Sequence, residues 1–189
     1  MANKDAAFGL KPIGKVGQNG DSNGLSEYDI AASATAIYFQ DPVAMAATGT
    51  VTVAAAGGVL LGSLNGVFFT DATTSKPTFA NHLNASNTAS DIKGFVTDDP
   101  YQRYEVQSNN AGASAQTDIG NVANIEYTAG SSPDFVSKVE LDDSDLATSD
   151  GQLKVIGVSR DPENSDLTSA NVNFVVTINE HFLKQEAGV

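Results

Sequence analysis

Short apolar runs separated by turn residues are the feature that most constrains the fold of this chain. Val51 and Val53 alternate with polar residues, and every second side chain from Val172 to Ile178 is apolar. A period of two places such residues on one face of a half-buried strand. Glycine, proline, asparagine and aspartate break the chain before a long helix could form. The sequence therefore predicts an all-β fold, a sandwich or barrel that is jelly-roll-like.

The stretch from Lys93 to Val106 shows this pattern at its clearest. An apolar strand leads into an Asp99-Pro100 turn, because proline restricts both its own backbone and that of the preceding residue. We expect a second strand after the turn, so that the whole stretch forms a hairpin. Its side chains alternate between two faces: Gln102, Tyr104 and Val106 lie on one, and Tyr101, Arg103 and Glu105 on the other. Similar Asp-Pro corners recur at Asp41-Pro42 and Asp161-Pro162.

Residues 1–26 are predicted to form an extended N-terminal arm, and residues 27–189 the β-domain. Phe8, Leu10 and Ile13 lie close together without helical spacing, among frequent glycines. A disordered tail would not usually carry so many apolar side chains. Two interpretations stay open: the arm folds back on its own domain, or it lies across a neighbouring subunit.

The charge of the chain is strongly acidic and unevenly placed. Ten Lys and Arg stand against 23 Asp and Glu, a net charge of −13. A surface this acidic repels phosphate backbones, so we expect no nucleic-acid partner. The first 20 residues carry Lys4, Lys11 and Lys15 against Asp5 alone, and the remainder has a net charge of −15. The basic tip either docks on an acidic surface or is simply solvated.

Neither export nor membrane insertion is expected. The first residues lack the long apolar core of a signal peptide. The most apolar stretch, residues 51–69, is interrupted by glycines and polar residues, so no membrane partner is predicted. The chain contains no cysteine, which leaves neither disulfides nor thiolate metal ligands.

The chemistry that the side chains offer is sparse. His82 and His181 are the only histidines, and their spacing assembles no metal site. No serine lies in a Gly-x-Ser-x-Gly elbow. The loop from Asp142 to Asp150 offers carboxylates but lacks the glycine and closing glutamate of an EF-hand, and it is better read as a solvated acidic turn. We therefore expect no enzyme activity, no cofactor and no metal.

Charged and aromatic residues at two of the Asp-Pro corners are candidates for contacts between subunits. An exposed ion pair there contributes only about 0–1 kcal/mol. These residues would therefore fix how neighbouring subunits align, but would add little to the affinity between them. The candidates are Asp99, Tyr101, Arg103, Arg160 and Asp161.

With these residues in view, the chain resembles the capsid cement or head-decoration proteins of tailed bacteriophages. Four segments carry the resemblance, in order along nearly the whole chain: residues 1–12, Asp41-Pro42-Val43, residues 98–107 and Ile178-Asn179-Glu180-His181. The resemblance implies a virion protein, made in the host cytoplasm, that sits on the outer surface of the icosahedral capsid. It would bridge neighbouring copies of the major capsid protein, without catalytic residues.

The residues of the predicted arm fit such a clamp. Each apolar side chain buried on a partner could supply about 1.5–3 kcal/mol, and the lysines would add orientation. The predicted capsid-binding residues are Lys4, Phe8, Leu10, Lys11, Ile13 and Lys15. The expected partners are the major capsid protein and further copies of the chain, in a symmetric homo-oligomer that is a trimer in preference to a dimer. The alternative is a head-fibre or glycan- or receptor-binding virion module, which needs an aromatic platform that a chain without Trp and with five Tyr scarcely offers.

Overall fold

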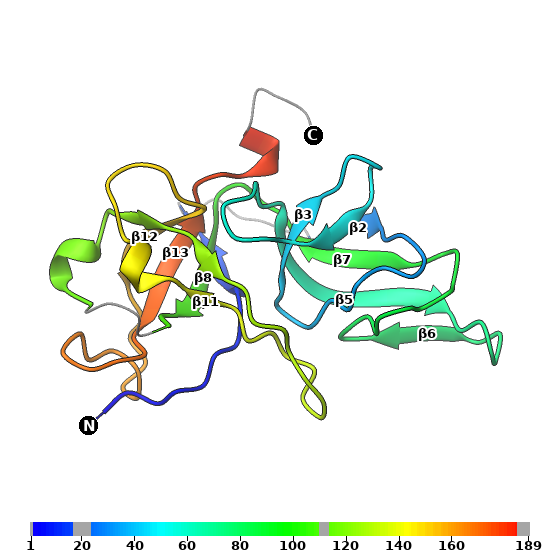
Figure 1. Ribbon diagram of the computed structural model, residues 1–189, viewed down its shortest axis with the longest axis horizontal. Coiled ribbons are helices and arrows are strands. Elements are labelled where there is room, and N and C mark those ends of the chain that lie inside the picture. The colour runs from blue at the N-terminus through cyan, green and yellow to red at the C-terminus, as the bar shows by residue number, and fades with distance from the viewer. Residues whose placement is uncertain (1, 17–23, 110–113, 185–189) are drawn as a thin grey trace.

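The computed structural model describes residues 2–16, 24–109 and 114–184 and places nearly all of their regular structure in antiparallel strands (Figure 1). The first sheet has the order β1 (Lys11–Lys15), β8 (Gln102–Gln107), β13 (Asn173–Ile178), β12 (Leu153–Val158) and β9 (Val122–Ala123). The second has the order β2 (Ser26–Asp29), β7 (Lys93–Thr97), β5 (Gly62–Thr70), β3 (Pro42–Met45) and β4 (Val51–Val53), and β6 (Pro77–Ala80) also pairs with β5.

Short elements complete the fold. A two-stranded ribbon joins β10 (Ile125–Glu126) to β11 (Glu140–Leu141). Three single-turn 3₁₀ helices are η1 (Gln116–Asp118), η2 (Asp143–Asp145) and η3 (Phe182–Lys184). No helix among the described residues is long and apolar enough to cross a membrane. The predicted all-β class is confirmed, whereas its jelly-roll refinement stays a prediction.

Each sheet has its own hydrophobic core. The second sheet is built from residues 26–97, which lie between β1 and β8 along the sequence. The first core is centred on Tyr104 and Phe174, and it includes Leu10 from the N-terminal segment. The second is centred on Leu64 and Val96. The first sheet lies in the left half of Figure 1 and the second in the right half. The division into an arm over residues 1–26 and a β-domain over residues 27–189 stays a prediction.

The prediction that residues 93–106 form a hairpin is wrong. β7 pairs with β2 and β5, whereas β8 pairs with β1 and β13, so the two strands belong to different sheets. The Asp99-Pro100 corner carries the chain from one sheet to the other. Tyr104 ties them together, because its hydroxyl donates to the carbonyl of Thr97 over 2.8 Å.

Two of the three Asp-Pro corners share one local structure. The Asp99 carboxylate accepts the N–H of Tyr101 over 2.7 Å, and the Asp161 carboxylate accepts that of Glu163 over 3.0 Å. In both, the carbonyl of the aspartate also accepts the N–H three residues later. This is the turn that aspartate before proline favours. Asp41 differs, since it is fully buried and its carboxylate accepts the N–H of Tyr38, three residues earlier.

Three short apolar stretches form only single bridges. Residues 36–39, 58–61 and 136–139 meet another segment at isolated pairs, such as Leu60 with His181 and Phe39 with Val136. These stretches are apolar because they cross between the sheets. The Gln152 amide bonds the carbonyls of Ala55 and Gly58 at this crossing, over 2.9 and 2.6 Å, and so joins the two halves.

Candidate interaction surfaces

The N-terminal segment, residues 2–16, is held against the rest of its own chain by burial and hydrogen bonds. Leu10 is fully buried in the first core, and its N–H donates to the carbonyl of Gln40 over 2.9 Å. The Lys4 carbonyl accepts amides from Gln107 and Asn164, over 2.9 and 2.7 Å. β1 completes the edge of the first sheet. Of the two interpretations of the predicted arm, these contacts of residues 2–16 favour the first, in which the segment folds back on its own domain; residues 1 and 17–23 lie outside the described residues.

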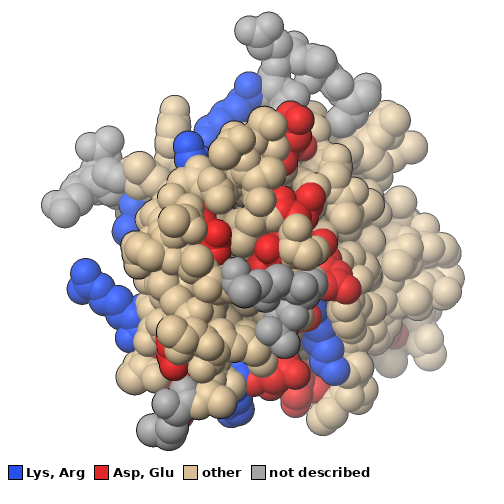
Figure 2. All heavy atoms as spheres, turned by 60° about the vertical axis from the view of Figure 1, so that its left-hand side comes forward, with Lys and Arg blue, Asp and Glu red and all other residues tan. Residues whose placement is uncertain are grey.

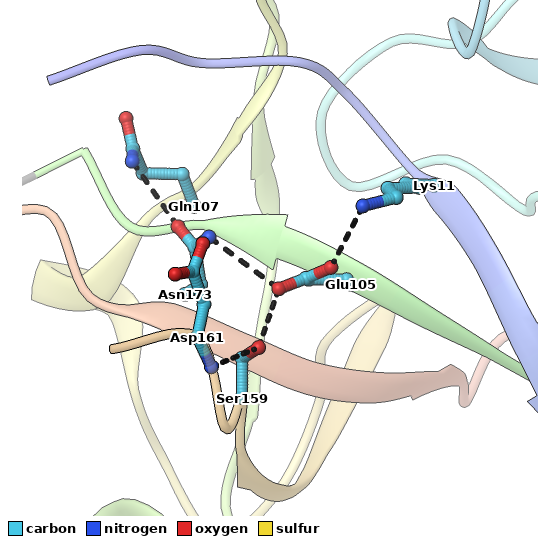
Figure 3. A network of polar contacts seen from close by, with 6 residues as sticks. All are labelled: Lys11, Glu105, Gln107, Ser159, Asp161 and Asn173. Carbon is cyan, nitrogen blue, oxygen red and sulfur yellow. Dashed lines mark hydrogen bonds and ion pairs between the residues drawn. The ribbon is translucent and has the colours of Figure 1, made fainter. Parts of the chain in front are cut away.

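A buried carboxylate holds this segment in place (Figure 3). Glu105 is 8 % exposed, and its Oε2 lies 3.3 Å from the Nζ of Lys11. Its Oε1 accepts the hydroxyl of Ser159 over 2.5 Å and the amide of Asn173 over 3.4 Å. The same Asn173 accepts the amide of Gln107 over 3.1 Å. The network joins β1, β8, β13 and the chain after β12, so its role is to fix β1 against the sheet.

The remaining predicted arm residues are divided between buried and exposed positions. Phe8 is half-buried, and the Lys11 Nζ lies 5.8 Å from the centre of its ring. Ile13 remains 43 % exposed at a bulge in β1, and Lys4 is exposed. Lys15 pairs with Asp99, its Nζ lying 2.5 Å from Oδ2. Hydrogen bonding to Lys15 is the main reason that the pKa of Asp99 lies below its usual value.

The predicted inter-subunit residues do not form one site. Asp99, Tyr101 and Arg103 lie together at the corner between β7 and β8. Arg103 leaves its Nε buried without a hydrogen-bond partner among the described residues. Asp161 instead lines a cavity of about 230 Å³ beside Glu105, and Arg160 is exposed. Asp99 and Asp161 thus line different cavities.

Exposed apolar side chains surround the first of these corners. Tyr101 is 62 % exposed, and the Lys184 Nζ lies 4.7 Å from the centre of its ring. The Val16 N–H donates to the Tyr101 carbonyl over 2.8 Å. Next to them, Leu25 and Leu183 line a cavity of about 460 Å³ together with Lys15 and Asp99. We call this the corner surface; its apolar members are Val16, Leu25, Tyr101 and Leu183.

His181 and Asp41 are ionisable groups buried near the junction of the sheets. His181 Nδ1 accepts the N–H of Leu183 over 3.1 Å. Burial, followed by the charge of Lys184, lowers the pKa of His181 to about 4, so the ring is neutral at pH 7. Burial raises the pKa of Asp41 to about 6, against the hydrogen bonds from Ser137 and Tyr38. Both side chains are fully buried.

Acidic side chains gather across the middle of the face shown in Figure 2. Glu126 and Glu140 lie directly opposite each other in the β10–β11 ribbon. Burial, and then the charges of Asp5, Glu126 and Asp143, raises the pKa of Glu140 to about 7. The described residues contain no group of three His, Cys, Asp or Glu that could hold a metal ion.

The loop from Asp142 to Asp150 turns its carboxylates toward its own chain. Asp142 accepts the N–H and hydroxyl of Ser144, over 3.0 and 2.6 Å, and so caps η2. Asp145 accepts the amide of Asn124 over 2.6 Å. These are structural roles typical of aspartate in tight turns.

Three phenylalanines form a strip on the outer face of the second sheet. Phe79 on β6 is 73 % exposed, and its ring centre lies 4.8 Å from that of Phe68 on β5 and 6.3 Å from that of Phe95 on β7. We call these three residues the Phe strip. Phe68 is not among the residues that the sequence singled out. A period of two along β5 could have identified it, because Val67 is buried and the next side chain must point outward.

Comparisons with known proteins add no relative. No family model, no curated protein and no solved structure matches the chain.

Proposed function

We propose that this protein is a structural, non-enzymatic virion protein that binds the outer surface of a bacteriophage capsid and cements neighbouring major capsid proteins. The proposal is supported by the positions, within the fold, of the four segments that carry the resemblance to cement proteins. β1 follows residues 1–10 directly and pairs with β8, which in turn pairs with β13. Leu10 bonds the residue before Asp41, and the chain after β13 reaches His181 at the sheet junction.

These segments are distant in sequence, yet they form one continuous part of the fold. A resemblance spread over unrelated loops would be weak support. A resemblance that falls on paired strands of the first sheet, on β3 of the second and on the junction between them is what a shared scaffold would produce. The charge of −13 supports the further proposal that the partners are proteins, namely capsid protein and copies of the chain, and not nucleic acid.

The capsid-binding surface in this proposal is the corner surface. Leu10 is buried in its own core and cannot serve as an anchor in this conformation. Tyr101 and Leu183 instead present exposed apolar area beside two lysines, Lys15 and Lys184. Tyrosine ringed by apolar and charged side chains is typical of residues that dominate the affinity of an interface. Many copies on one shell would multiply a modest affinity.

Binding to capsids that lack the protein tests the proposal. The purified chain is mixed with such heads, and the bound fraction is measured by sedimentation. We expect the wild type to bind and Tyr101→Glu to lose most of its occupancy while its melting temperature is unchanged.

Ile156→Glu is the matched control, because Ile156 is also an exposed apolar side chain but lies on β12 of the first sheet. It should bind as the wild type does. A wild-type chain that stays in the supernatant would refute the cement function. Full binding by Tyr101→Glu would refute only the choice of surface.

A further inference from the structure

β6 is an edge strand that exposes a large aromatic side chain. It pairs with β5 on one side, and no described strand pairs with its other side. Figure 1 shows it at the rim of the second sheet. Phe79, in this strand, is 73 % exposed. An open edge beside an exposed aromatic ring is a template for pairing with another strand.

The hydrogen-bond pattern shows which main-chain groups this edge presents. The Asp71 N–H donates to the Lys76 carbonyl over 3.0 Å, and the register then pairs Thr70 with Pro77 and Phe68 with Phe79. Because bonded and non-bonded pairs alternate in an antiparallel ladder, the N–H and C=O of Phe79 point away from β5. The bond from the Thr70 N–H to Asp91, over 3.0 Å on the other side of β5, follows the same alternation.

The charge around this edge suits a second copy of the same chain. Residues 72–90 contain no Asp or Glu and one basic residue, Lys76, although the whole chain carries 23 acids. Two copies with a net charge of −13 each repel one another over most of their surface. Residues 72–90, which include β6, add no carboxylate to that repulsion.

We propose that two copies of this chain associate across a twofold axis by pairing their β6 strands antiparallel, with Phe79 opposite its counterpart. Directly opposite residues point to the same face of a sheet, so the two Phe strips join into one row of six rings. The six-stranded sheet becomes a continuous sheet of twelve strands.

Proline limits how far this pairing extends. Pro77 lies at the next outward-facing position and has no N–H to donate. The pairing is therefore confined to the bonds around Phe79, which sets the register. An interface of this size belongs to the weak class, so the dimer is expected at high protein concentration or on a surface that gathers many copies.

The inference concerns the free protein and does not depend on a capsid, so its failure and that of the proposed function are distinguishable. Sedimentation equilibrium of the full chain over a concentration series should show a monomer–dimer equilibrium. Phe79→Glu should raise the dimer dissociation constant by about tenfold or more, because it places two carboxylates opposite each other. Ile156→Glu, with the same change of charge on the first sheet, should leave it unchanged.

A cysteine crosslink tests the register independently. The chain contains no cysteine, and directly opposite residues in a bonded antiparallel pair have Cα atoms about 5.5 Å apart, within disulfide range. Phe79→Cys should form a dimer on mild oxidation, and Ile156→Cys should not.

Three outcomes would overturn the inference. One is a wild-type chain that stays monomeric at the highest concentration while Phe79→Cys crosslinks no faster than Ile156→Cys. Another is a dimer or trimer that Phe79→Glu leaves intact. The third is a monomer that binds an immobilised glycan through the Phe strip, with loss of binding in Phe79→Ala, which would assign the strip to glycan recognition.

Discussion

The main-chain N–H of Leu10 donates to the carbonyl of Gln40 across 2.9 Å, and this bond fastens the N-terminal segment to the junction between the two sheets. Gly9 precedes it with a φ of +78°, in the left-handed region that favours glycine. The turn at Gly9 brings the Leu10 side chain into the first core and sends the following residues along β8. The segment is therefore part of the folding unit.

Shortening Leu10 should destabilise the isolated protein. Leu10→Ala leaves a cavity in a core that has no solvent access, and we expect a loss of about 2–5 kcal/mol in the free energy of unfolding. Ile13→Ala, three residues away at a side chain that is 43 % exposed, should change it by no more than about 0.5 kcal/mol. Chemical denaturation of both variants gives the two values. Equal, small effects would show that the segment detaches from the body in solution.

Gly9→Ala should be more damaging than the same substitution at Gly49. A Cβ at residue 9 would lie 2.4 Å from the Gln40 carbonyl oxygen, whereas one at residue 49 would meet nothing within 4 Å. Both glycines have a φ of +78°, so the left-handed backbone alone costs each variant about 1–2 kcal/mol. The excess loss in Gly9→Ala measures the close approach to Gln40 and Ser137. Thermal unfolding curves that coincide for the two variants would contradict this close approach.

Glu140→Gln should stabilise the protein at pH 8. The pKa of Glu140 is raised to about 7, chiefly by burial and then by neighbouring acids, so the ionised carboxylate opposes folding above that pH. As pH falls from 7 toward the ordinary value of 4.5, the folded state takes up its proton first and the penalty disappears. The melting temperature of the variant should exceed that of the wild type at pH 8 and converge with it near pH 4.5. A difference that does not vary with pH would point to packing instead.

His181 should make the protein sensitive to acid. Its pKa is lowered to about 4 in the folded state from 6.5, so the unfolded chain binds the proton more tightly over that interval. Stability is lost as pH falls from 6.5 to 4. His181→Gln keeps a polar side chain but cannot titrate, and its melting temperature should fall less steeply than that of the wild type between these values. Parallel curves would show that other groups cause the acid sensitivity.

Local pattern predicted much of this fold. The alternation from Val172 to Ile178 predicted β13, and the alternation after Pro100 separated the buried Gln102, Tyr104 and Val106 from the opposite face. The aspartates before Pro100 and Pro162 predicted two turns that share one hydrogen-bond pattern. In each case the determining interactions lie within a few residues, so the sequence records them directly.

The candidate surfaces were less accessible to prediction. Tyr101 and Asp99 were identified at their corner, but the apolar residues that adjoin them, Leu25 and Leu183, come from distant segments. Phe68 and Phe95 lie beside Phe79 on an outer face because of the strand order, which the sequence pattern does not specify. Side-chain period specifies which residues share a face of a strand, but not which face the rest of the chain covers.

By itself, the sequence determined the all-β class, the acidic charge and the turns, since these depend on composition and on neighbours along the chain. The tertiary structure alone decided that β7 and β8 belong to different sheets, that Leu10 lies in its own core, and that Phe79 lies on an open edge. Strand pairing and burial are contacts between residues far apart in sequence. A pattern of period two fits several partners equally well, and only the packing of the whole chain selects one.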